Sequence, residues 1–166
     1  MGGPRDHARG WAYLPGIETW TGSMTTAGIA GLAIVKDRLR ALGKSDKETE
    51  KKIDASLIDA CAWLAKNFAV NKNPGGGGWH YYYLYGLERA GAMTGLRWFG
   101  QHEWYREGAE YLIHAQEPDG GWPAYTGPEN TSLQIRVTQS CFALLFLRRA
   151  SVPPSQPIGP VVTSGG

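Results

Sequence analysis

The chain has 166 residues, of which 42% are hydrophobic, so it is long enough to form one domain with its own core. Its 17 basic and 15 acidic residues give a net charge of +2, which provides no basic surface for nucleic acid. The longest apolar runs, Ala27–Val35 and Cys141–Leu147, are too short to cross a bilayer, so no transmembrane segment is predicted. The N-terminus lacks the apolar stretch of a signal peptide, which predicts a cytoplasmic protein; secretion stays open if a signal lies upstream.

Five helices and no strand are predicted, the first from about Ser23 to Leu42. It should end near Gly43, because glycine commonly terminates a helix. Ser45 and Glu48 have the spacing of a capping box, which predicts the start of the second helix. Apolar residues at helical spacing then predict one buried face: Ile53, Leu57, Cys61, Leu64 and Phe68.

A break with Asn73-Pro74 and four glycines, 75–78, predicts a flexible loop rather than a phosphate site, because no Walker motif follows. The third helix should run from about Trp79 to Ala92, since the strand-like run of tyrosines continues in a helical pattern. The remaining helices are predicted at His102–Gln116 and Ser132–Ala150.

The fifth predicted helix is apolar on all sides over Cys141–Leu147, which indicates that this segment is buried. Both cysteines, Cys61 and Cys141, are therefore expected to be buried free thiols. We predict one helical repeat domain over residues 1–150 and a disordered tail rich in proline and glycine over residues 151–166.

The chain also contains an internal repeat. Trp11-Ala12-Tyr13 precedes the small, apolar helix segment 24–30, and Trp122-Pro123-Ala124-Tyr125 precedes the similar segment 137–143. The two copies are 111 to 113 residues apart, about the length of two helical hairpins. Such self-similarity indicates stacked helix pairs.

The segment Gly108-x-x-x-Leu112-x-x-x-Gln116-x-x-x-Gly120-x-Trp122 resembles the QW motif of the terpenoid cyclase and protein prenyltransferase superfamily of α/α toroids. Arg9-Gly10-Trp11 resembles the end of a preceding copy, and segments 79–95 and 104–122 resemble uncharacterised bacterial proteins with prenyltransferase and squalene cyclase-type repeats.

The resemblance implies an all-α fold of antiparallel helical hairpins, in which the first, third and fifth helices form an inner layer. Five helices are too few for a ring of six hairpins, so a partial toroid is expected: a fragment of a closed (α/α)6 barrel, with missing N-terminal hairpins of the same protein as its partner. Within the motif, Gln116 should end a helix, Gly120 should permit a tight turn, and Trp122 should pack back, all in structural roles.

The sequence contains no complete catalytic motif of the enzymes that it resembles. The Asp-x-Asp-Asp acid of squalene–hopene cyclases is absent. Asp59-Ala60-Cys61 matches the Asp-x-Cys zinc pair of prenyltransferases formally, but residues two apart point to nearly opposite sides of a helix. We therefore predict no metal site and no cofactor.

An aromatic cluster opens the third predicted helix, and its members are the candidate ligand-binding residues: Trp79, Tyr82, Tyr83 and Tyr85. Two interpretations stay open for them, packing between helices or lining a ligand cavity. If a charged group faces such a cavity, Glu88 is the candidate acid or anchor, with His80 and Tyr85 as its neighbours.

Two functions remain at this point. The first is a toroid repeat module whose aromatic inner face binds an apolar or isoprenoid-like ligand or a peptide. The alternative is the C-terminal fragment of an isoprenoid cyclase of the squalene/hopene type, or of a prenyltransferase-like enzyme, whose acid or metal site lies upstream.

Overall fold

The computed structural model describes residues 7–17, 19–123 and 133–149. They form five helices, α1 (Gly22–Ala41), α2 (Lys47–Lys66), α3 (His80–Thr94), α4 (Trp104–Ala115) and α5 (Leu133–Arg148). Within these ranges there is no β-strand, only the isolated bridges Trp11–Thr21 and Phe99–His102. The prediction of an all-α protein with five helices is confirmed. The predicted tail, residues 151–166, lies outside the described residues.

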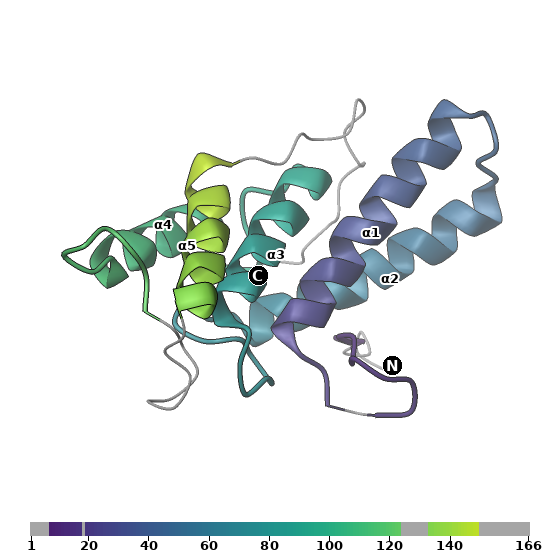
Figure 1. Ribbon diagram of the computed structural model, residues 1–166. Coiled ribbons are helices and arrows are strands. Elements are labelled where there is room, and N and C mark those ends of the chain that lie inside the picture. The colour runs from purple at the N-terminus through teal and green to yellow at the C-terminus, as the bar shows by residue number, and fades with distance from the viewer. Residues whose placement is uncertain (1–6, 18, 124–132, 150–166) are drawn as a thin grey trace.

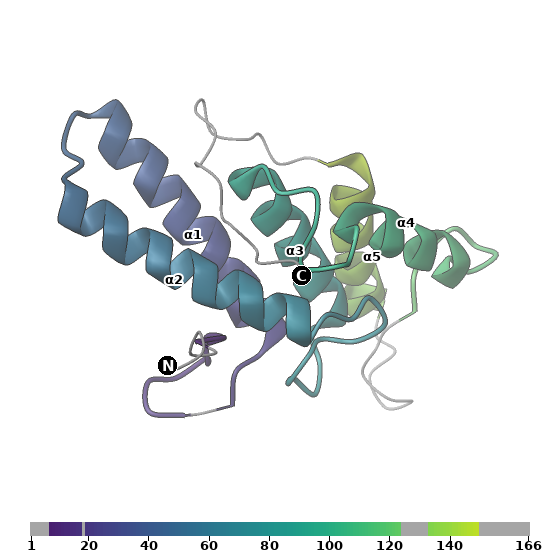
Figure 2. The same ribbon diagram turned by 180° about the vertical axis from the view of Figure 1, so that it is seen from behind.

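The helices form two layers. Helix α3 packs between α1 and α5, whereas α2 packs on α1, and α4 packs on α3 and α5. In Figure 1 the helices α1, α3 and α5 stand in one row and run in the same direction. Figure 2 shows α2 and α4 on the opposite side of this row. The described helices form an open row, and it stays a prediction that this row is a fragment of a closed (α/α)6 barrel.

Within the α1–α2 hairpin, hydrogen-bonded caps mark the end of α1 and the start of α2. Gly43, with φ +63°, and Lys44 donate their amides to the carbonyls of Arg40 and Leu39, which closes the end of α1 as expected for a glycine there. The prediction of Ser45 as the start of α2 is wrong. Asp46 is the N-cap, because its carboxylate accepts the amides of Glu48 and Thr49.

Close packing of α1 against α3 depends on small residues. A Cβ at Gly22 would lie 2.7 Å from the Tyr83 ring, and one at Gly86 would clash with the Thr26 hydroxyl. The two helix axes therefore approach more closely than larger side chains would allow. This contact places the N-terminal turns of α1 and α3 side by side.

The glycine-rich loop is fastened to the start of α1. The buried Asn73 side chain accepts the amide of Ser23 at 2.9 Å and donates to the Ser23 hydroxyl and the Gly78 carbonyl. Gly75 has φ +69°, and a Cβ there would clash with the Trp20 carbonyl. Part of the glycine run is thus needed for close backbone approach, which the prediction of a merely flexible loop did not anticipate.

The prediction that Cys141–Leu147 is buried is wrong. Cys141 is exposed, as is Leu144 at 57%, whereas Ala143 and Phe146 are buried. Helices α3 and α4 cover one side of α5, and no described element covers the other side. Cys61, in contrast, is fully buried as expected.

In the described ranges no helix has the length and apolar character needed to cross a membrane.

Candidate functional site

Four aromatic rings form a strip across the N-terminal half of α3 and the middle of α5. Trp79 and Tyr82 meet edge to face with ring centroids 6.4 Å apart, and Tyr82 meets Phe142 edge to face at 5.5 Å. Phe142 also stacks on Tyr85 at 5.5 Å. These are favourable geometries for aromatic pairs. We call Trp79, Tyr82, Phe142 and Tyr85 the aromatic strip.

The aromatic strip lines two adjoining cavities. The larger, of about 650 Å³, lies between the glycine-rich loop and the first turns of α1 and α3, and its wall includes Trp79, Tyr82 and Phe142. The smaller, of about 200 Å³, continues between α1 and α3 past Tyr85 to Arg89. Both cavities include Ser23 and Tyr82 in their walls, so they form one groove along α1 and α3. We call this the α1–α3 groove.

Most polar side chains in the groove are already hydrogen-bonded within the protein. Asn73 uses its side-chain oxygen and its amide nitrogen on Ser23 and Gly78. The Thr21 hydroxyl accepts the amide of Met24 and shares a hydrogen bond with the Ser23 hydroxyl at 3.2 Å. A ligand in the groove would therefore meet mainly apolar and aromatic surface.

Trp79 stands at the mouth of the groove in an unusual conformation. It is the N-cap of α3, has φ +59° in the left-handed region, and caps no amide with its side chain. Its side chain is 67% exposed, so core packing does not explain this backbone conformation. Outliers of this kind are often found at ligand sites.

The structure separates the predicted ligand-binding residues into two groups. Trp79, Tyr82 and Tyr85 line the groove, whereas Tyr83 is buried in the core. Its ring packs against Gly22, and burial raises the pKa of its hydroxyl. Tyr83 therefore lines neither of the two cavities.

The three candidate catalytic residues are not brought together. His80 is buried, its Nε2 donates to the Val70 carbonyl at 2.8 Å, and burial lowers its pKa. Glu88 is buried and lines a separate cavity of about 620 Å³, together with Trp104 and Arg149. Tyr85 lies in the α1–α3 groove. The arrangement provides no shared site for proton transfer.

Several residues of the groove were not predicted from the sequence. Phe142 comes from α5, and Ser23 and Asn73 come from segments 50 residues apart in the chain. Arg89, on α3, also lines the groove without having been predicted to do so. No local pattern identifies these residues, because only the packing of separate elements brings them to the groove.

The segment Gln116–Trp122, which we call the QW-like segment, closes the end of α4. Gln116 is the C-cap of α4, and its side-chain amide donates to the Gly120 carbonyl at 2.9 Å. Gly120 has φ +84°, as a tight turn requires. The buried Trp122 indole donates to the Leu112 carbonyl at 2.8 Å, which is one of the last four carbonyls of α4.

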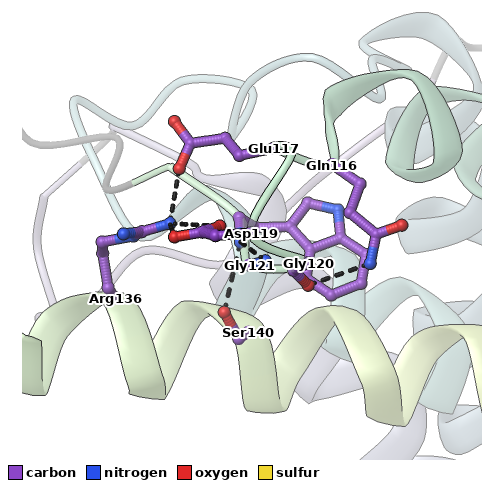
Figure 3. Close-up of polar contacts among 8 residues, drawn as sticks. Gln116, Glu117, Asp119, Gly120, Gly121, Arg136 and Ser140 are labelled. Atoms are coloured by element: carbon purple, nitrogen blue, oxygen red, sulfur yellow. Dashed lines mark hydrogen bonds and ion pairs between the residues drawn. The ribbon is translucent and has the colours of Figure 1, made fainter.

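Two further contacts join this segment to α5. The Trp122 amide donates to the Ser140 hydroxyl at 3.2 Å. Figure 3 shows Arg136 reaching from α5 to Glu117 and Asp119, with an Nη2 to Oδ2 distance of 2.7 Å for Asp119. The segment thus fixes α5 relative to α4.

The Trp11 loop repeats one of these contacts at the other end of the row. The Trp11 amide donates to the Thr25 hydroxyl of α1 at 3.0 Å, as the Trp122 amide does to Ser140 of α5. The Trp11 ring packs on Gly28 of α1. The two tryptophans therefore fasten equivalent loops to two helices of the same layer.

The formal zinc pair does not form a metal site. Burial raises the pKa of the Cys61 thiol to about 12, which opposes the thiolate that zinc requires. The described ranges contain no group of three or more histidine, cysteine or acidic residues placed to hold a metal ion.

Comparison with models of protein families, with curated proteins and with solved structures finds no match to this chain.

Proposed function

We propose that this chain is a repeat module of the α/α-toroid type that binds an elongated, isoprenoid-like apolar ligand in the α1–α3 groove. The observation that carries the proposal is that Trp79, Tyr82, Tyr85 and Phe142 line two adjoining cavities. Aromatic side chains around a cavity of several hundred Å³ are typical of small-molecule sites.

The toroid part of the proposal is supported by the layer order and by the two tryptophan loops. Helices α1, α3 and α5 share one layer and one direction, and α2 and α4 lie behind them. Exposed apolar side chains at both edges of the row, such as Val35 on α1 and Leu144 on α5, support further hairpins as neighbours.

An apolar chain is favoured over a peptide by the hydrogen bonding of the groove. A bound peptide would bring backbone donors and acceptors that need partners when they are buried. The side chain of Asn73 is already occupied by Ser23 and Gly78, so it offers such a peptide no vacant group in this arrangement.

The enzyme alternative receives no support from a particular arrangement of the described residues. Glu88, His80 and Tyr85 lie in three different environments. A cyclase or prenyltransferase-like activity would therefore need an acid or metal site on a part of the protein other than the described ranges.

Isothermal titration of the full chain with farnesol tests the proposal. Tyr82→Ala should weaken binding about tenfold or more, because it removes the ring shared by both cavities. Tyr105→Ala is the matched control, since Tyr105 lines the separate cavity beside Glu88.

Three results would contradict the proposal. They are the absence of saturable farnesol binding to folded protein, an equal loss of affinity in both tyrosine variants, and tighter binding of an apolar decapeptide at the same site.

A further inference from the structure

One end of the α1–α3 groove carries a positive charge. Arg89, on α3, lines the smaller cavity, and its Nη1 donates to the Tyr85 hydroxyl at 3.4 Å. Its guanidinium lies 5.8 Å from the centroid of the Tyr85 ring. Among the described residues that line the two cavities, Arg89 has the only formal charge.

No carboxylate of the described chain forms an ion pair with Arg89. The neighbouring Glu88 lines the separate cavity next to Trp104, on another side of α3. The charge of Arg89 is therefore not neutralised within the groove. A purely apolar ligand beside this guanidinium would displace its water and return no hydrogen bond, which is unfavourable.

The groove also has a defined length. Trp79 and Arg89 are ten residues apart on α3, which corresponds to about 15 Å along the helix axis. On the α1 side the smaller cavity is lined by the small residues Ala27, Ala30 and Gly31, which leave room for a narrow chain. Aromatic surface lines most of this distance, and a cation lies at its end.

The geometry points to a ligand with a narrow apolar chain and one terminal anionic group, a carboxylate or a phosphate ester, bound by Arg89. A guanidinium binds both groups through paired, charge-assisted hydrogen bonds. This inference rests on the proposed function and adds the chemistry of one end of the ligand. The features that support the proposed function, the aromatic strip and the QW-like segment, do not depend on an anionic group in the ligand.

Titration of the full chain with decanoate, decyl phosphate and decanol, each below its aggregation concentration, tests the inference. At least one of the two anions should bind about tenfold or more tightly than decanol, because a hydrogen bond between two charged groups is stronger than one to a neutral hydroxyl. The better anion of the two identifies the headgroup. Raising the salt concentration should weaken binding of the anions and leave decanol binding nearly unchanged.

Variants at Arg89 test whether its guanidinium is the group that binds the anionic end of the ligand. Arg89→Gln should reduce affinity for the anions to that for decanol, and Arg89→Lys should retain part of the preference. Arg97→Gln is the matched control, because Arg97 lines the separate cavity and is paired with Glu103.

The outcomes separate this inference from the proposed function. Equal binding of decanol and both anions, or a preference for anions that survives Arg89→Gln, would overturn the inference and leave the apolar groove in place. If none of the three ligands binds to folded protein, both proposals fail.

Discussion

At the scale of single residues, Trp79 is the least expected feature of the molecule. Left-handed backbone is unfavourable for a bulky side chain by about 1–2 kcal/mol, and here the side chain remains 67% exposed. The strain is therefore not repaid by burial in the described core. Its position at the mouth of the α1–α3 groove provides the reason to keep a tryptophan there.

Replacing Trp79 by glycine should separate stability from binding. Glycine adopts left-handed backbone without strain and is an acceptable N-cap, so Trp79→Gly should preserve stability or raise it by up to about 1 kcal/mol. Farnesol affinity should fall about tenfold, because an aromatic wall of the groove is lost. Urea unfolding and isothermal titration measure the two effects.

Trp98→Ala serves as the control, since Trp98 is also exposed and lines neither cavity of the groove. It should change neither stability nor affinity appreciably. A large loss of stability in Trp79→Gly would show instead that Trp79 is a packing residue.

At this scale, three of the four residues of the aromatic strip could be predicted from the sequence. Trp79, Tyr82 and Tyr85 were predicted because they cluster within one turn or two of a single helix. Tyr83 was included for the same reason, yet it is buried in the core and lines neither cavity. A run of consecutive aromatic residues covers every face of a helix, so composition does not reveal which rings meet a cavity.

At the scale of helices and loops, the predicted boundaries agree with the structure to within a few residues. Two details that were predicted wrongly have local physical causes. Asp46, rather than Ser45, is the N-cap of α2, because its ionised carboxylate accepts two amides there. The apolar sequence of α5 predicted burial on all sides, but burial depends on neighbours that a helix pattern cannot specify.

The helix-end role of Trp122 gives a prediction about stability. Trp122→Phe keeps an aromatic ring but removes the donor to the Leu112 carbonyl, which should cost about 1–3 kcal/mol in urea unfolding. Gln116→Ala should cost less, because the Gln116 side chain is exposed and donates to a turn carbonyl. Equal stability of the wild type and Trp122→Phe would contradict this helix-end role of Trp122.

The far end of the α1–α2 hairpin gives a prediction about pH. Arg40 and Ser45 donate hydrogen bonds to Glu50 and lower its pKa from 4.5 to about 2. The folded state therefore binds this proton less readily than the unfolded state, so the contribution of Glu50 is present above pH 4.5 and is lost as the pH falls toward 2.

Glu50→Gln should consequently make the stability of the protein less dependent on pH in this range. Thermal unfolding between pH 2 and 5 measures the change. Glu48→Gln is the control, since the Glu48 carboxylate forms an exposed pair with Lys52. A wild-type pH dependence that persists in Glu50→Gln would contradict the assignment.

At the scale of the whole molecule, the row of helices has apolar edges. Val137, at 53%, and Leu144, at 57%, are exposed on α5, and Val35 is exposed on α1. Contiguous apolar surface of this kind commonly marks a contact surface. Additional hairpins of the same repeat type would cover these edges, as the resemblance to α/α toroids implies.

Charged residues at the α5 edge should reduce binding of an apolar dye. The double variant Val137→Lys and Leu144→Lys should bind less anilinonaphthalene sulfonate and aggregate less than the wild type. Ile113→Lys is the control, because Ile113 is exposed at 65% on α4, away from the open edges of the row. A similar reduction in the control would show that the α5 edge has no special role.

A titration of ¹⁵N-labelled protein with farnesol, followed by amide chemical shifts, tests the central claim of a ligand groove between α1 and α3 most directly. The predicted result is saturable shifts at residues 21–24, 76–89 and around Phe142, with small changes around the separate cavity at residues 95–97 and 103–105. Shifts that concentrate at the separate cavity, or the absence of saturable shifts in folded protein, would contradict it.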